Sequence, residues 1–131
     1  MDDQNLIQKD LIKKVVEDAR GAVGIRLCAI GVDLGIFDNL AKHGPATSQE
    51  LAVRMKLDER YLREWGLGMF SLGYLDFDKV SRKISLNKEF IPVLVEEGGK
   101  FSQKGLIEIL NSSLLPYHEL LNSFKNGGGI N

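Results

Sequence analysis

The sequence has 131 residues, of which 44% are hydrophobic and 27% charged, and its formal net charge is −1. These values are typical of one soluble globular domain and exclude a disordered or fibrous protein. The balanced charge gives no electrostatic reason to expect nucleic acid or an anionic membrane as a partner. The polar N-terminus and the lack of an apolar run of about 18 residues argue against a signal peptide or a membrane span, so we expect a cytoplasmic protein.

The first predicted element is an amphipathic helix over residues 5–18, within an N-terminal unit of residues 1–21. Leu6, Leu11 and Val15 recur at helical spacing on one side, and Lys13 lies on the other. Two glycines follow, at positions 21 and 24, and we expect them to loosen the chain before the next helix.

A second helix is predicted over residues 23–42, ending at a glycine and a proline that stop it. This helix is apolar on nearly every side, and Cys28 in its middle is expected to be a buried, inert thiol that forms no disulfide within the chain. A small domain cannot cover such a helix completely. We therefore predict a homodimer whose interface combines this helix with the first one around Leu6 and Leu11. Gly31 and Gly35 would admit a closely packed helix, either from the partner or from the same domain.

The central stretch, residues 47–74, predicts two short helices joined by a tight turn. Thr47 and Glu50 have the spacing of a capping box, so a helix should begin at Ser48. Asp58 is the expected N-cap of the second helix, with an apolar staple formed by Leu57 and Leu62. The buried face of the second helix should consist of Leu62, Trp65, Met69 and Leu72. Two such helices form a helix-turn-helix.

Two alternating segments, residues 74–77 and 83–86, predict a β-hairpin after the helix-turn-helix. The predicted fold is therefore mainly α: a winged helix-turn-helix over residues 22–87, with additional helices before it and over residues 88–126. Pro92 limits the first of the later helices to a short one. We expect Tyr117 and Phe124 to pack in the core rather than to line a pocket.

The run GVDLGIFDNLAKHGPATSQELAVRMKLDERYLREWGLGMFSLGYLDFD, followed by KISLN, resembles the N-terminal winged-helix domain of small-molecule methyltransferases that use S-adenosylmethionine, including O-methyltransferases. The resemblance covers residues 22–87. It implies that the domain dimerises and roofs a substrate pocket, while a following Rossmann-like domain binds the cofactor and performs catalysis. That domain is not found in this sequence. The glycine-rich residues 127–131 resemble the junction that precedes it.

The remaining candidate motifs carry no chemistry that we can assign. Gly66 and Gly68 form a G-x-G inside a predicted helix rather than after a strand, which favours packing over dinucleotide binding. His43 and His118 lack further ligands at metal-binding spacing, and we interpret them as solvated residues. We therefore name no catalytic, cofactor-binding or metal-binding residue.

Three functions remain open from the sequence. The first is a methyltransferase accessory domain, which would not be catalytic alone and whose parent enzyme would use S-adenosylmethionine. The second is a DNA-binding regulator in which Arg60 and Arg63 of the second helix would face DNA. The basic residues of the wing would assist them: Lys79, Arg82 and Lys83. Against this function, Glu59 and Glu64 lie on the same helix surface and would repel phosphates. The third is a dimerisation or scaffold module.

Overall fold

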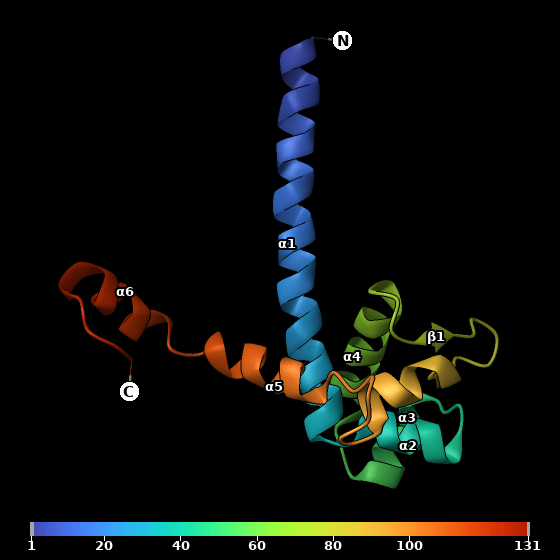
Figure 1. Cartoon of the computed structure of the whole chain (residues 1–131). Helices are drawn as coiled ribbons and strands as arrows, with labels where there is room; N and C mark the ends of the chain where they lie inside the picture. The colour runs from blue at the N-terminus through green and yellow to red at the C-terminus, as the bar shows by residue number, and fades with distance from the viewer. Residues whose placement is uncertain (1, 131) are drawn as a thin grey trace.

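A computed structural model describes residues 2–130, in which a winged helix-turn-helix lies at the centre and a helical arm extends from it at each end of the chain (Figure 1). The fold is mainly α with one small antiparallel hairpin, as predicted. The elements in chain order are α1 (Asp3–Asp33), α2 (Ile36–His43), α3 (Ser48–Met55), α4 (Glu59–Ser71), β1 (Asp76–Phe77), β2 (Ile84–Ser85), η1 (Lys88–Phe90), η2 (Ile91–Val95), α5 (Lys104–Ser113) and α6 (Tyr117–Asn126).

Helix α1 is continuous for 31 residues, so the predicted break at Gly21 and Gly24 is wrong. Neither glycine adopts a positive φ. A glycine inside a helix costs about 1 kcal/mol relative to alanine, which is too little to interrupt a helix with good formers on both sides. The chain turns instead at Gly35, whose φ of 73° lies in the left-handed region that glycine adopts without strain. The predicted helix over residues 23–42 is therefore divided between α1 and α2.

Close packing at Gly31 occurs within the domain, which is one of the two alternatives that the sequence left open. A Cβ atom at Gly31 would lie 2.5 Å from the Phe37 ring and 2.7 Å from Trp65. The two aromatic rings pack against each other with centroids 5.5 Å apart. Because Gly31 has no side chain, α2 folds back tightly against α1 and α4.

The helix-turn-helix is formed by α3 and α4, and its predicted caps are confirmed. The Glu50 amide donates to the Thr47 hydroxyl at 3.1 Å, and the Thr47 amide donates to the Glu50 carboxylate at 3.1 Å. The Asp58 carboxylate accepts from the Tyr61 amide at the start of α4. Leu57, the first residue of the predicted staple, packs against the core that contains Leu62.

The wing is a hairpin in which Asp76 pairs with Ser85 and Phe77 with Ile84. Both strands are shorter than predicted, with two residues each. An isolated bridge between Ala46 and Ile84 connects the wing to the loop before α3. The predicted short helix near Pro92 consists of the 3-10 turn η1 and the π-helix η2, which has Pro92 in its first turn.

The core lies where the C-terminal half of α1 meets α2, α3, α4, the wing, η2 and α5. It consists of the buried side chains Cys28, Ala29, Ile36, Phe37, Leu40, Ala46, Leu51, Leu62, Trp65, Met69, Leu75, Ile84, Leu94 and Ile107. Leu72, which was predicted to share the buried face of α4, caps that helix and is only half-buried.

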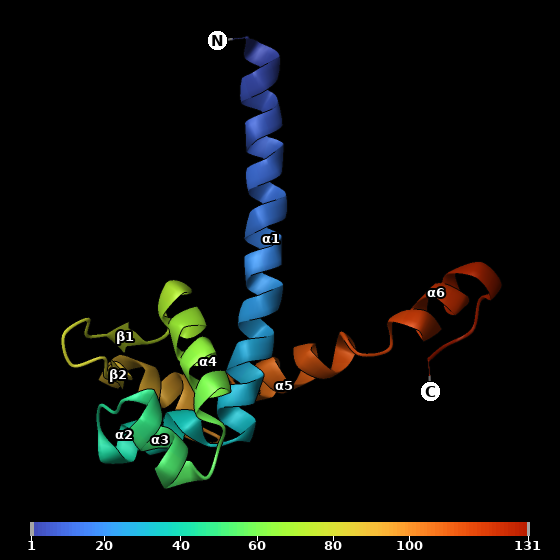
Figure 2. The ribbon, with the colours of Figure 1, turned by 180° about the vertical axis from the view of Figure 1, so that it is seen from behind.

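The C-terminal arm leaves the core at α5, and both views show α6 at its far end, away from the winged helix (Figures 1 and 2). Helix α5 contacts α1 through the buried Ile107. Helix α6 has no buried residue, and Tyr117 and Phe124 are 62% and 85% exposed. Their predicted core packing is therefore wrong. Periodicity identifies the apolar side of a helix, but it cannot show whether the same domain covers that side.

Candidate functional site

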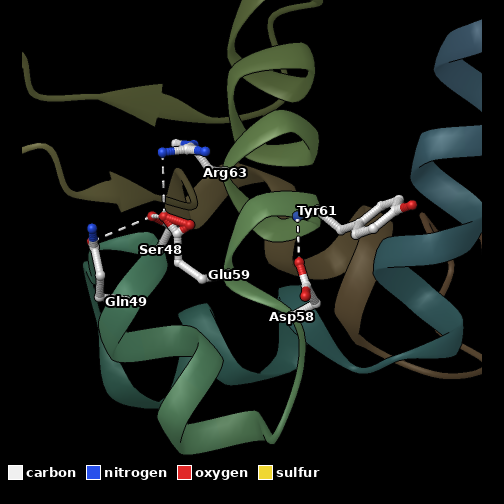
Figure 3. A network of polar contacts seen from close by, with 6 residues as sticks. All are labelled: Ser48, Gln49, Asp58, Glu59, Tyr61 and Arg63. Carbon is white, nitrogen blue, oxygen red and sulfur yellow. Dashed lines mark hydrogen bonds and ion pairs between the residues drawn. The ribbon is translucent and has the colours of Figure 1, made fainter.

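The surface of α4 that would face DNA in a winged-helix regulator has balanced charge. The Arg63 guanidinium lies 3.6 Å from the Glu59 carboxylate, and the Ser48 hydroxyl at the start of α3 donates to the same carboxylate at 3.3 Å. Figure 3 shows these side chains between α3 and α4. Arg60 and Glu64 are exposed on the same helix. The pairing of Arg63 with Glu59 reduces its attraction for phosphate, so this surface lacks the excess of positive charge that a DNA-binding helix needs.

The wing tip is closed by a local hydrogen-bond network around Asp78. Its carboxylate accepts from the Val80 amide at 2.8 Å and from the Ser81 amide at 3.2 Å. These backbone donors hold the pKa of Asp78 below its ordinary value. Asp78 thus forms the base of the wing tip. The side chain of Val80, at the tip itself, is 94% exposed.

The G-x-G motif of α4 packs this helix against its neighbours. A Cβ atom at Gly66 would lie 3.3 Å from Ile84 of the wing, and one at Gly68 would lie 3.1 Å from Leu27 of α1. The indole nitrogen of Trp65, the residue before Gly66, donates to the Leu27 carbonyl at 2.9 Å. These contacts support the packing interpretation over a dinucleotide loop.

Cys28 is buried, with 1% of its surface exposed, and it forms no disulfide. Burial raises the pKa of its thiol, and a hydrogen bond with Tyr74 opposes that shift to a smaller extent. Burial also raises the pKa of Tyr74, with a further contribution from Cys28. A buried thiol with a raised pKa is poorly nucleophilic, as the sequence predicted.

A partly open cavity of about 650 Å³ lies between the C-terminal end of α1, the start of α2 and helix α5. This volume is within the range of small-molecule sites. Its polar lining includes Asp33, Asp38, Glu97, Lys104, Glu108 and Asn111. Lys104 pairs with Glu97 at 3.1 Å.

Sequence analysis missed this cavity. Glu108, Asn111 and Ser112 repeat at i, i+3 and i+4 on α5, a polar stripe that could have indicated one of its walls.

Two apolar grooves lie beside α1 and α4. The first groove, of about 350 Å³, is lined mainly by Val16, Val23 and Leu27 of α1 and by Gly68 and Leu72 of α4. The second groove, of about 230 Å³, lies between the C-terminal end of α1, the start of α2 and the start of α4. It is lined by Ile30, Leu34, Ile36, Leu57, Asp58, Tyr61, Leu62 and Trp65.

The N-terminal half of α1 extends away from all other elements in both views (Figures 1 and 2). Its apolar side chains are exposed to solvent by 48% to 69%: Leu6, Ile7, Leu11, Ile12, Val15 and Val16. This half of the helix and the two grooves together form a candidate interaction surface.

The histidines are not brought together with other metal ligands. His43 ends α2 and His118 lies on α6, at the far end of the other arm. Across residues 2–130 there is no cluster of three or more His, Cys, Asp or Glu side chains arranged to hold a metal ion. Within the same range, every helix is too short or too polar to cross a membrane.

The sequence profile of the Rv2258c-like winged HTH domain matches residues 21–95, more than half of the chain. The chain belongs to this family. The match begins within α1 and ends with η2, so it includes the helix-turn-helix, the wing and the short helices after it. No curated protein matches the sequence of this winged HTH domain.

Solved structures similar to this winged HTH domain include three methyltransferases or related proteins. Mitomycin 7-O-methyltransferase MmcR has a TM-score of 0.72 and 18% identity, over 95% of this chain and 37% of its own. PigF with SAH has a TM-score of 0.70 and 19% identity, over 87% and 33%. An O-methyltransferase family 2 protein from Planctomyces limnophilus, in complex with apigenin, has a TM-score of 0.62 and 26% identity, over 78% and 30%.

The winged HTH domain thus spans about a third of the length of these proteins. It has the fold of the N-terminal domain of O-methyltransferases, and the resemblance seen in the sequence is confirmed.

Proposed function

We propose that this chain is the N-terminal dimerisation and substrate-pocket domain of an S-adenosylmethionine-dependent methyltransferase. The observation that carries the proposal is the winged helix, which belongs to a recognised family and has the fold of O-methyltransferase N-terminal domains. Catalysis would belong to another domain of the parent protein. The proposal includes a cytoplasmic location, in keeping with a free thiol at Cys28.

The residues described do not fit the cofactor itself. S-adenosylmethionine would need a strand that leads through a glycine-rich loop into a helix, with an acidic residue placed for the ribose. The sheet described here is a two-stranded antiparallel hairpin, and the G-x-G motif lies within α4. We therefore derive no catalytic step from this chain.

Its contribution would be to shape the substrate site and to assemble the enzyme. The partly open cavity beside α5 has the volume of a small-molecule site, and a second domain packed against the C-terminal arm could close it. The exposed apolar half of α1 and the two grooves would bury their surface in a homodimer. At about 25 cal/mol per Å², covering a few hundred Å² of apolar surface contributes several kcal/mol before the costs of association.

Two measurements test the proposal. Calorimetry with S-adenosylmethionine should detect no stoichiometric binding by the chain alone. A micromolar dissociation constant would contradict the assignment of cofactor binding to another domain. Sequencing the coding region beyond Asn131 should reveal a strand, a glycine-rich turn and an acidic residue. The absence of any such domain, there or in a protein that co-purifies with the chain, would argue for a stand-alone scaffold.

A further inference from the structure

The cavity beside α5 has more negative than positive charge in its lining. Asp33 lies at the C-terminal end of α1, Asp38 in the first turn of α2 and Glu108 in α5. Glu97 also lines the cavity, and it is paired with Lys104, the one basic side chain among the described lining residues. Within residues 2–130, no ion pair involves Asp33, Asp38 or Glu108. Three unpaired carboxylates, from three helices, therefore line one cavity.

Asp33 occupies a helix end that favours the opposite charge. The last carbonyl groups of a helix carry partial negative charge, so a basic side chain stabilises the final turn and an acidic one destabilises it. Helix α1 ends with Asp33 and has no basic residue in its last turn. Departures from such local rules are expected mainly at functional sites. A cation bound beside Asp33 would offset both its carboxylate and the negative end of the helix.

Asn111, on the α5 wall of the cavity, contains a hydrogen-bond acceptor without a donor. In the orientation that the structure gives this amide, its Oδ1 atom is buried and accepts no hydrogen bond from the described residues. Such atoms destabilise the folded state and are uncommon in native proteins. Glu108 precedes Asn111 by three residues, so the two side chains are neighbours on α5. Because χ2 of asparagine is broad, a bound donor could turn this oxygen toward itself.

The size and lining of the cavity favour an organic cation over a metal ion. Its volume of about 650 Å³ is within the range of small-molecule sites. The described His, Cys, Asp and Glu side chains form no cluster of three or more that could hold a metal ion, so the carboxylates are spread around the cavity. Ala29, Val32 and Ile107 add apolar surface to the same lining. An amine with an apolar carbon skeleton matches both parts.

We propose that this cavity binds an organic amine in its ammonium form, with the nitrogen beside Glu108 and Asn111 and the carbon skeleton against Val32 and Ile107. This inference rests on the role in the substrate site proposed above and names the class of substrate. An ammonium group has several donors and one positive charge, which suits a carboxylate next to an amide oxygen. The other unpaired carboxylates increase the attraction, and they repel a ligand that carries a carboxylate.

Three small molecules that differ mainly in charge test this preference on the full chain: phenethylamine, phenethyl alcohol and phenylacetate. Nuclear magnetic resonance of the isotope-labelled protein gives each dissociation constant and shows which amides shift. At low ionic strength the amine should bind about tenfold or more tightly than the alcohol, and phenylacetate more weakly than either. The amide shifts should be concentrated in α5 and at the end of α1. Salt should reduce the preference for the amine, because it screens exposed charges.

Glu108→Gln removes a charge and keeps the size of the side chain. It should weaken amine binding by about fivefold and leave alcohol binding nearly unchanged. Glu64→Gln is the matched control, since Glu64 is exposed on α4 and does not line the cavity. Asp33→Asn is a second variant that relieves repulsion at the helix end, so it should also weaken amine binding while the fold is retained. Circular dichroism verifies the helical content of each variant.

The outcomes separate this inference from the proposed function. Equal binding of the amine and the alcohol, shifts away from the cavity, or equal effects of Glu108→Gln and Glu64→Gln would overturn the amine site. They would leave the methyltransferase assignment intact, because that assignment is decided by the coding sequence and by titration with S-adenosylmethionine. An amine preference in a protein without a methyltransferase domain would support the amine site and contradict the proposed function.

Discussion

At Gly31 of α1, the rings of Phe37 and Trp65 occupy the space that a side chain would need. We expect Gly31→Ala to destabilise the domain by about 1–3 kcal/mol, the usual cost of overpacking a well-packed core. Urea unfolding followed by circular dichroism measures the difference.

Gly21→Ala is the matched control, since it makes the same change on the same helix. Gly21 is exposed and no atom lies within 4 Å of the position of its missing Cβ. Alanine there should leave stability unchanged or raise it by about 0.5–1 kcal/mol. Equal effects at both positions would mean that Gly31 does not sustain the contact with α2.

Cys28 provides a second test at a single residue. Its thiol is buried and its pKa is raised from the ordinary value of 9.0. A group whose pKa is raised by folding contributes stability that is fully present below its unfolded pKa and is lost as the pH rises through the folded value. Stability attributable to Cys28 should therefore be constant below about pH 9 and decline above it.

The same burial predicts slow labelling. A thiol reagent should modify Cys28 rapidly in urea and only slowly in buffer at neutral pH, with a rate that follows the unfolded population. Cys28→Ala isolates the contribution of the thiol to the pH profile, although Tyr74 titrates nearby and has a raised pKa of its own. Rapid labelling of the native protein would show that α1 and its neighbours open locally.

At the scale of the element, the start of α3 is stabilised by a reciprocal pair of hydrogen bonds between Thr47 and Glu50. Thr47→Ala removes the oxygen that accepts from the Glu50 amide, and we expect a loss of about 1 kcal/mol. Gln49→Ala, in the exposed first turn of the same helix, should change stability by less than about 0.5 kcal/mol. Thermal or urea unfolding of both variants gives the comparison, and similar values would indicate that solvent replaces the cap.

The helix-turn-helix could be predicted accurately because its signals are local. A capping residue acts on an amide three positions away, and an apolar stripe can be recognised within the sequence of a single helix. The end of the long first helix could not be placed, because a glycine is tolerated in a helix unless the chain must turn there. The turn at Gly35 depends on where Phe37 packs, and that contact involves α4.

The candidate surfaces were less predictable than the fold. The polar cavity and the two grooves are each formed by elements distant in sequence, so no single segment contains their pattern. The exposure of Tyr117 and Phe124 has a related cause, because an amphipathic helix has the same sequence whether its own domain or another covers it.

For the molecule as a whole, the charge distribution predicts weak interaction with DNA. The net charge is −1, and Arg63 is already paired with Glu59. We expect nonspecific binding with a dissociation constant on the order of 10⁻⁴ M or weaker at physiological salt. Gel shifts with wild-type protein and with an Arg60→Ala, Arg63→Ala variant provide the measurement. A footprint at nanomolar protein that disappears in the variant would favour a DNA-binding regulator.

The hydrogen bond from the Trp65 indole to the Leu27 carbonyl has an optical consequence. Trp65 is the single tryptophan of the chain, is 5% exposed, and lies where α4 meets the C-terminal half of α1. Its fluorescence therefore comes from one site at the boundary between the core and the second groove. A ligand or partner bound in that groove would shift the emission, whereas events confined to α6 would leave it unchanged. The native protein therefore contains its own spectroscopic reporter for occupation of the second groove.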